Sequence, residues 1–337
     1  MIVLGLESSC DETGAGLVDM ATATILSNVV ASQHQTHAVY GGVVPELATR
    51  EHLRNLSPVV TRSLKQAGLG MGQVDAIAVT RGPGLAGCLH LGLSAAKALA
   101  LALDKPWIGV NHLEGHLLAA FLEHKNLEFP YVGLVISGGH TGLVDVRGPF
   151  ERRRLDATLD DAVGEAFDKV AKLLDLGFPG GPAVDVLAQS HAGRRIDFPK
   201  ARPKDGGKGF SYSGLKTAVR THVEKVRRAG QEPDKAAVAA GFRRAAVAPL
   251  VEKAVQEAQG LGYTRVVAGG GVAANLLLRE CLTEACLKAG LQAFLCSPAL
   301  CADNGAMIAY AGGLRMLTGQ GSPWDLGIDP NLDECSA

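Results

Sequence analysis

Two segments of the chain repeat one pattern of hydrophobic and polar positions. Apolar runs at residues 2–6 and 15–18 flank a polar turn at 7–14, and the same order returns within residues 131–146, with the turn at 137–142. Short apolar runs joined by a polar, glycine-bearing turn are typical of β-hairpins. The sequence therefore predicts two hairpins with polar tips, and one lobe that repeats the plan of the other.

Longer segments with helical periodicity follow each predicted hairpin. Apolar strands at residues 76–79 and 265–268 precede two of these segments. Because strands alternate with helices, we expect an α/β protein with mainly parallel strand pairing. The predicted helices span residues 47–67, 91–103, 162–174, 213–228, 234–259, 274–290 and 304–317.

The length of the chain predicts more than one domain. It has 337 residues, of which 47% are apolar, and this exceeds the usual size of a single domain. We expect a first lobe at residues 1–128 and a second at 129–303, with a helix at 304–322 packing back on the first lobe.

Charge and cysteine content bear on the cellular location of the protein and on its contacts with nucleic acid and membrane. The 33 basic and 34 acidic residues nearly cancel, so any contact with nucleic acid must come from local patches. The start of the chain has no basic leader pattern, and no apolar run reaches the roughly 18 residues of a membrane span. The seven cysteines are scattered, with no Cys-x-x-Cys pair, as expected of reduced thiols. We expect a cytoplasmic protein with no membrane contact.

Three glycine- or serine-rich turns follow predicted strands, at residues 8–14, 137–142 and 269–274. Such turns expose backbone N–H groups that can bind phosphate oxygens. One turn alone is more often simple turn geometry, but repetition favours a nucleotide site. Together the turns resemble the two-lobed actin, hexokinase and Hsp70-like (ASKHA) plan, which implies duplicated mixed sheets flanked by helices.

A His-x-x-x-His pair suggests a metal site. On a helix, His112 and His116 share one face and can bind one cation. Asp303, in a polar turn after a predicted apolar strand, is the candidate third ligand. The alternatives are two ordinary histidines and a helix N-cap at Asp303. A zinc protease of the His-Glu-x-x-His type is disfavoured, because Leu113 follows the first histidine.

Acidic residues gather at two further places. Asp11 and Glu12 lie in the first glycine-bearing turn, where either could act on a proton, or where both could form a solvated acidic turn. Asp161, Glu165 and Asp168 recur along one side of a predicted helix, close to a Pro-Gly-Gly-Pro turn. A carboxylate there suits hydroxyl groups of a ligand, although a solvated face is the simpler interpretation.

Basic residues cluster in the second half of the chain, where they could neutralise RNA phosphates. Most surface Lys and Arg residues have no such role. The clusters lie at residues 152–154, 194–195, 200–208, 227–228 and 243–244.

Six motifs in combination resemble the bacterial tRNA adenosine threonylcarbamoyltransferase family, once labelled O-sialoglycoprotein endopeptidases. The resemblance extends from residue 1 to about residue 325, and it separates this chain from sugar kinases of the same broad plan. The motifs lie at residues 7–13, 41–46, 112–116, 137–141, 164–169 and 301–305.

The resemblance implies a metal-dependent acyltransferase. Its members move the threonylcarbamoyl group from threonylcarbamoyl-AMP to the exocyclic amine of the adenosine that follows the anticodon, in tRNAs that read codons beginning with A, and they release AMP. An adenine amine is a weak nucleophile, so the site must position it, the metal must offset charge on the leaving phosphate, and a carboxylate can take the proton. The mixed anhydride is already activated, so we expect direct attack without a covalent intermediate on Cys10 or Ser137.

The resemblance also implies a role for particular residues. Asp11 and Glu12 lie near the reacting centre, and His112, His116 and Asp303 hold one divalent metal ion per subunit. That ion is iron in the family, with zinc or magnesium as alternatives. The adenylate substrate, or ATP or ADP, would lie in the cleft. The residues implied to bind it are Val135, Ile136, Ser137, Gly138, Gly139, Asp168, Gly181, Asp185 and Asn275.

The expected partners are tRNA, a shorter inactive paralogue and a small P-loop ATPase of the same pathway. Two other functions remain open from the residues alone. The phosphate turns also fit a small-molecule kinase, although the histidine pair suits it poorly. A nucleotide-binding scaffold without catalysis is the third possibility, against which the acids at Asp11, Glu12 and Asp303 count.

Overall fold

The computed structural model describes residues 1–193, 196–203, 206–333 and 335. The chain divides into two compact units, each described here by itself. Unit 1 comprises Met1–Leu127 and Cys296–Ala337, and unit 2 comprises Glu128–Leu295. The second boundary differs from the prediction, because Cys296–Asp303 belong to unit 1 and not to the second lobe.

Unit 1 is built on a five-stranded sheet of order β3-β2-β1-β4-β5. The hairpin β1–β2 and its neighbour β3 pair antiparallel, whereas β4 and β5 continue parallel to β1. The strands are β1 (Ile2–Glu7), β2 (Glu12–Asp19), β3 (Thr24–Ser32), β4 (Ala76–Gly82) and β5 (Trp107–Asn111).

Unit 2 repeats this plan in its sheet of order β10-β9-β6-β7-β8. The first three strands again pair antiparallel, and β9 and β10 follow in parallel. The strands are β6 (Tyr131–Ile136), β7 (Thr141–Val146), β8 (Arg152–Ala157), β9 (Arg265–Gly269) and β10 (Gln292–Leu295). The duplicated mixed sheets are confirmed, while mainly parallel pairing is wrong because three strands of each sheet form an antiparallel meander.

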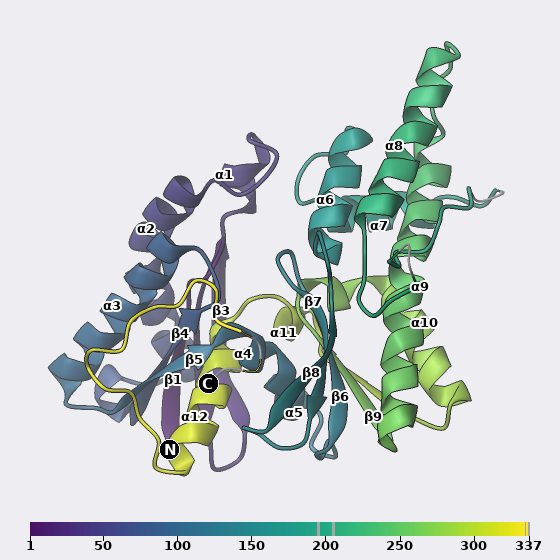
Figure 1. The fold of residues 1–337 in the computed structure, drawn as a ribbon. Helices are drawn as coiled ribbons and strands as arrows, with labels where there is room; N and C mark the ends of the chain where they lie inside the picture. The colour runs from purple at the N-terminus through teal and green to yellow at the C-terminus, as the bar shows by residue number, and fades with distance from the viewer. Residues whose placement is uncertain (194–195, 204–205, 334, 336–337) are drawn as a thin grey trace. The chain divides into compact units, whose positions relative to one another are not determined.

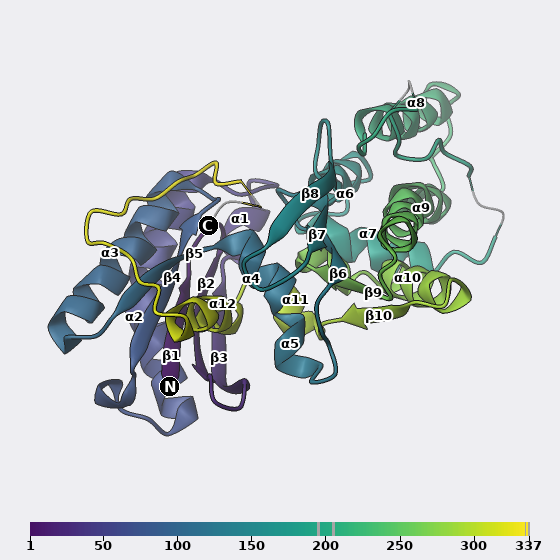
Figure 2. The same ribbon diagram turned by 60° about the horizontal axis from the view of Figure 1, so that its bottom comes forward.

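The helices flank the sheets within each unit (Figures 1 and 2). Those of unit 1 are α1 (His34–Ala38), α2 (Pro45–Ala67), α3 (Ala86–Leu103), α4 (His112–Leu118), α5 (Ala120–Glu123), α11 (Pro298–Cys301) and α12 (Gly305–Leu317), with a 3-10 turn η1 (Met71–Gln73). Those of unit 2 are α6 (Val163–Leu173), α7 (Gly180–Gln189), α8 (Ser213–Arg228), α9 (Lys235–Leu261) and α10 (Leu276–Lys288), with a 3-10 turn η2 (Gly271–Ala274).

Helix α3 corrects one expectation from the sequence. Its 18 residues are long and apolar enough to cross a membrane by length and composition alone. In unit 1, however, α3 packs against β4 and α2 and buries Leu89, Leu93 and Ala96. These contacts cover one face of α3 with protein, and 33% of the helix is buried.

Glycines let α12 lie directly on the β1–β2 hairpin. A Cβ atom at Gly5 would overlap the carbonyl oxygen of Gly305, and one at Gly16 would overlap the backbone of Ala306. The contact is therefore backbone against backbone, with no room for a side chain between helix and sheet. Both ribbon views show the yellow α12 against the purple β1 (Figures 1 and 2). This packing fixes where α12 begins, just after Asp303.

The Gly5→Ala variant tests this packing. The added methyl group must push α12 away from β1, so we expect a loss of about 1–3 kcal/mol in the free energy of unfolding, measured by urea denaturation. Gly72→Ala is the matched control, because a Cβ atom there meets no neighbour within 4 Å. Equal denaturation midpoints for the two variants would show that the contact is not tight.

Candidate functional site

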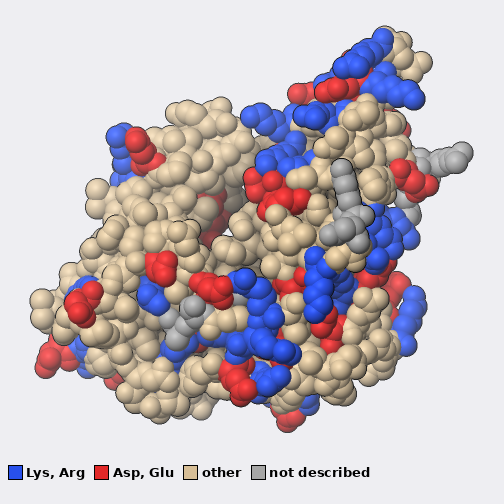
Figure 3. Space-filling view, in the orientation of Figure 1, with Lys and Arg blue, Asp and Glu red and all other residues tan. Residues whose placement is uncertain are grey.

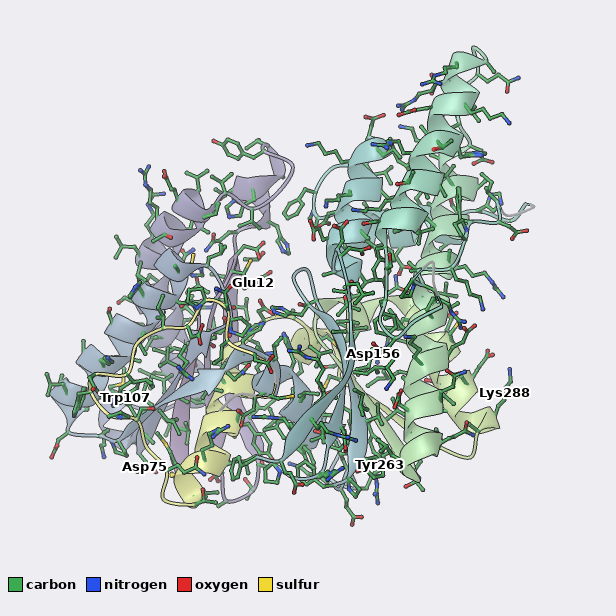
Figure 4. All side chains as sticks on the ribbon, in the orientation of Figure 1. Glu12, Asp75, Trp107, Asp156, Tyr263 and Lys288 are labelled. Atoms are coloured by element: carbon green, nitrogen blue, oxygen red, sulfur yellow. The ribbon has the colours of Figure 1, made fainter. Side chains whose placement is uncertain are left out.

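The polar residues of unit 1 gather at the carboxyl ends of its parallel strands. Because β1, β4 and β5 run in the same direction, the segments that follow Glu7, Gly82 and Asn111 share one edge of the sheet. In Figure 4, Glu12 lies at this edge, while Asp75 and Trp107, at the starts of β4 and β5, lie towards the opposite edge. Open α/β sheets commonly bind ligands at the carboxyl edge.

Helix α4 carries the histidine pair into this edge. Its N-cap is Asn111, whose side-chain oxygen accepts a hydrogen bond from Leu113 N at 3.0 Å. One turn apart, the rings of His112 and His116 have centroids 4.6 Å apart, and both residues are buried. The helix therefore presents two imidazoles on one face, as the spacing predicts.

Asp303 meets both imidazoles, although it comes from the far end of the sequence. Its Oδ1 lies 3.1 Å from His116 Nε2 and 3.4 Å from His112 Nε2. The N-cap of α12 is Asn304, which accepts a hydrogen bond from Met307 N, so the alternative interpretation of Asp303 as the cap is wrong. The Asp303 carboxylate instead faces the histidines.

His112 lies between two carboxylates. Its Nδ1 is 2.9 Å from Glu7 Oε2, and its Nε2 faces Asp303. A neutral imidazole has one N–H, so one of these contacts would set a lone pair against a carboxylate oxygen. Burial favours the neutral imidazole, but Asp303 and Glu7 outweigh it and hold the pKa of His112 well above its usual range. The arrangement therefore calls for a cation, either a proton or a metal ion.

The donor set fits a divalent metal ion. Two imidazole nitrogens and one carboxylate oxygen are ligands that iron(II) and zinc accept, with positions left for other ligands. Glu7 is fully buried and is held by Ser9 N at 2.6 Å and the Thr80 hydroxyl at 2.5 Å. A carboxylate that fixes the remaining nitrogen of a metal-binding histidine is a common supporting feature.

Asp11 lies in the turn between β1 and β2, Glu12 is the first residue of β2, and both lie beside His34. The Glu12 Oε1 atom lies 2.9 Å from His34 Nε2, and Asp11 Oδ2 lies 3.6 Å from the same nitrogen. Burial raises the pKa of Glu12 to about 7, helped by the nearby charges of Asp303 and Asp11 and opposed by the hydrogen bond with His34. A carboxyl group that titrates near neutrality suits proton transfer.

Two features that support this site do not follow from the sequence. His52 on α2 donates from Nε2 to the Cys10 carbonyl at 2.9 Å and accepts from the Thr13 hydroxyl at 2.8 Å, which holds the acidic turn in place. On the other side of α4, Arg315 of α12 makes a buried, bidentate ion pair with Glu114 at 2.8 and 3.0 Å. The Arg315–Glu114 pair joins α4 to α12, the two helices next to the metal-binding residues.

Unit 2 brings together the residues implied to bind the adenylate. The turn at Ser137 follows β6, and the parallel β9 ends beside it at Gly269, so that a Cβ atom at Gly270 would overlap the carbonyl oxygen of Ile136. Gly138 and Gly139, in contrast, have open space where a Cβ atom would lie. Exposed backbone of this kind can approach a ligand closely.

Three further predicted residues of unit 2, Asp168, Asp185 and Asn275, make side-chain hydrogen bonds. Asp168 accepts from Gly180 N at 2.8 Å, which fixes the start of α7 next to the open position at Gly181. Asn275 caps α10 and donates to Asp185 at 3.0 Å. Thus Asp168 and Asp185 both hold loop backbone or side chains in place. Val135 and Ile136 are buried in β6.

Several sequence interpretations need correction or lie outside the described residues. Arg243 is half-buried and pairs with Asp185 at 2.5 Å, so it is not placed to neutralise RNA phosphates. Asp161 precedes α6 instead of lying on it. Of the basic clusters, residues 194–195 and 204–205 lie outside the described part of the chain.

Comparison with solved structures defines the class of protein. HypF of T. kodakarensis shares the fold with a TM-score of 0.62 at 16% identity, over 94% of this chain and 48% of HypF. Component A of (R)-2-hydroxyglutaryl-CoA dehydratase from Acidaminococcus fermentans has a TM-score of 0.56 at 14% identity, over 94% and 99% of the two chains. At these identities the likeness shows the fold alone, which is the ASKHA plan.

Comparison with known sequences defines the family. The family model of tRNA N6-adenosine threonylcarbamoyltransferase matches residues 24–310. Proteins of that name from Anaeromyxobacter sp. (strain Fw109-5) and Geobacter sp. (strain M21) are 50% and 49% identical to this chain over 333 and 330 residues. These alignments cover 98% of this chain and 99% and 96% of the two relatives. The chain belongs to this family, which confirms the resemblance seen in its motifs.

Proposed function

We propose that this chain transfers the threonylcarbamoyl group from threonylcarbamoyl-AMP to the exocyclic amine of the tRNA adenosine that follows the anticodon, and that AMP leaves. Family membership over nearly the whole chain supports the tRNA reaction. The meeting of Asp303 with His112 and His116 is the single structural observation that carries the proposal. The family match gives no support to a small-molecule kinase or an inactive scaffold.

In this proposal, His112, His116 and Asp303 hold one divalent ion. When bound, the ion supplies positive charge that offsets the charge developing on the leaving phosphate. Resemblance to the family favours iron, and the same donors also accept zinc. Glu7 keeps the His112 ring in the orientation that leaves Nε2 for the metal.

The adenylate part of the donor is assigned to unit 2. Backbone N–H groups at Gly138, Gly139 and Gly181 would face the phosphate and ribose, because these glycines leave the backbone accessible, and residues 135–137 would line the same site. Asp168, Asp185 and Asn275 would line the same site and keep its loops in place. Three of these residues are held by hydrogen bonds, Asp168 with Gly180 and Asp185 with Asn275.

Glu12 is the proposed proton acceptor, with Asp11 beside it. The amine proton leaves as the nitrogen attacks the carbonyl carbon, and a carboxylate at Glu12 can receive it. Direct attack is favoured over a cysteine intermediate, because burial and the neighbouring Asp11 raise the pKa of the Cys10 thiol well above its usual range. A thiol that stays protonated is a poor nucleophile.

The setting of the enzyme is also proposed from its family. We expect it to act in the cytoplasm with a shorter inactive paralogue and a small P-loop ATPase. Reconstitution of the full chain with these partners, threonylcarbamoyl-AMP and unmodified tRNA, followed by mass spectrometry of the nucleosides, tests the activity as a whole.

The Glu7→Gln variant tests the metal site without an activity assay. It keeps all three proposed ligands but weakens the acceptor for His112 Nδ1, so we expect about 10–100-fold weaker binding of Zn²⁺ in competition with a chelating dye. Asp303→Asn should bind still more weakly. Glu51→Gln, a change of the same kind at the surface, serves as the control. Wild-type affinity in the Glu7→Gln variant would contradict the proposed arrangement.

The pH dependence of single-turnover transfer tests the role of Glu12. The base is active when deprotonated, so we expect the rate to rise with pH and to level off above about pH 7. Glu12→Gln should lower the rate about 100–10,000-fold and flatten this profile.

Stability should show the opposite trend with pH. The pKa of Glu12 in the folded protein is raised above the ordinary value of 4.5, so its contribution to folding is present below that value and is lost as pH rises through about 7. The wild type should therefore lose stability relative to Glu12→Gln over this range.

The pH-rate profile of transfer has its own contradicting outcome. If the same profile persists in Glu12→Gln, a group other than Glu12 accepts the amine proton.

A further inference from the structure

Helix α8 has an excess of basic residues that the chain as a whole does not have. Leu215, Val219 and Val223 form its buried stripe, and the opposite face is exposed. Five of its residues are basic and one, Glu224, is acidic, although the whole chain has a net charge of −1. We call the basic residues the α8 ridge; they are Lys216, Arg220, Lys225, Arg227 and Arg228.

The ridge borders a groove between α6 and α8. The groove has a volume of about 300 Å³, and its lining includes Lys169, Lys216 and Arg220 together with the hydroxyl groups of Ser213 and Thr217. Figure 3 shows Lys and Arg gathered over these two helices, in the upper part of unit 2. Cations interleaved with hydroxyl groups are the side chains that most often contact nucleic-acid phosphates.

Each of the three cations of the groove has an acidic neighbour. Asp161 pairs with both Lys169 and Lys216, and Glu165 pairs with Lys169 at 2.7 Å. Arg220 is 63% exposed, and its ion pair with Glu224 is long, at 4.0 Å. Arg220 can therefore turn to another anion at little cost, and the excess of basic residues lies farther along the ridge, in the last turn of α8.

The neighbouring Asp160 forms hydrogen bonds with the residues at the start of α8. Its carboxylate accepts hydrogen bonds from the Ser211 hydroxyl at 2.6 Å and from the backbone N–H groups of Tyr212 and Ser213 at 2.8 and 3.3 Å. These donors and the positive end of the helix dipole offset its charge. Asp160 therefore fixes the N-terminus of α8 without opposing an anion farther along the helix.

We propose that the α8 ridge and the α6–α8 groove bind the phosphate backbone of the tRNA substrate. The inference rests on the proposed function, since it names a surface for the same substrate. Backbone phosphates are the dominant source of affinity for a basic surface, and contacts with them position a nucleic acid without reading its bases. Such contacts suit an enzyme that acts on several tRNAs.

A charge-removal series tests the ridge. The triple variant Arg220→Gln, Lys225→Gln, Arg228→Gln removes three exposed cations and leaves the pairs Lys216–Asp161 and Arg227–Asp175 intact. The control variant removes three exposed cations of α2 in unit 1, by Arg54→Gln, Arg62→Gln and Lys65→Gln. Circular dichroism checks that both fold.

The readout is the Kd of the full chain for unmodified tRNA, measured by fluorescence anisotropy over a range of salt concentrations. We expect the ridge variant to bind at least about tenfold more weakly than the control, with a log Kd against log salt slope that is shallower by about 2–3. Equal weakening in both triple variants, or none in the ridge variant, overturns the proposal. Unchanged tRNA affinity with loss of transfer only when partner proteins are present also overturns it, and assigns the ridge to a protein partner.

Transfer rates over a range of tRNA concentrations distinguish a failure of the ridge proposal from a failure of the proposed function. If the wild type transfers the group and the ridge variant shows a raised KM with an unchanged kcat, the ridge acts in docking. If the wild type transfers the group and the ridge variant matches it at all tRNA concentrations, only the ridge proposal fails. Absence of transfer by the reconstituted wild type, with tRNA binding intact, refutes the proposed function instead.

Discussion

The contact between α12 and the β1–β2 hairpin is the constraint on which the unit 1 site depends. It is made by backbone atoms on both sides, because Gly5, Gly16 and Gly305 have no side chains to separate them. Close packing of this kind is rigid, since neither surface can yield without losing many contacts at once. The position of Asp303, two residues before α12, follows directly from it.

The same helix packs against α4, so both halves of the candidate metal site share one support. One face of α4 presents His112 and His116 to Asp303. Glu114, which lies between them in the sequence, pairs with Arg315 in the last turn of α12. Buried ion pairs add little stability by themselves, but loss of one partner leaves an uncompensated charge. The Glu114–Arg315 pair therefore resists any shift of α4 along α12, and Glu7 holds the His112 ring from the direction of the sheet. The geometry of the donors is prepared before a metal ion arrives.

The sequence predicted those parts of the protein that depend on local pattern. The two hairpins and the helix at Ser213–Arg228 carry clear periodicity, and the structure contains them. Strand β8 was missed because Arg152–Ala157 is mostly charged, and β10 because it has only four residues. The predicted boundary at residue 303 lies eight residues beyond Leu295, the last residue of unit 2. The chain in fact returns to unit 1 at Cys296, ahead of α11 and α12.

Contacts between residues far apart in the sequence could be predicted only where both residues belong to a family motif. Family resemblance joined Asp303 to the histidines, although 187 residues separate it from His116. The supporting residues His52 and Arg315 lie in none of these motifs, since their partners are set by the packing of distant elements. Glu7 lies in the motif at residues 7–13, but its contact with His112 is visible only in the structure. The basic residues of α8 are visible in the sequence. Only the structure shows which of them are exposed and which basic residues elsewhere, such as the half-buried Arg243, are engaged in ion pairs.

X-ray absorption spectroscopy of the metal-loaded chain tests the central claim most directly, that packing of α12 completes a metal site from α4 and Asp303. With Zn²⁺ bound at one equivalent, the account requires a first shell of nitrogen and oxygen at about 2.0–2.2 Å, with the multiple-scattering pattern of two imidazoles that disappears in the double variant His112→Ala, His116→Ala. A shell containing sulfur at about 2.3 Å, or an unchanged spectrum in that variant, would place the metal elsewhere and contradict the account.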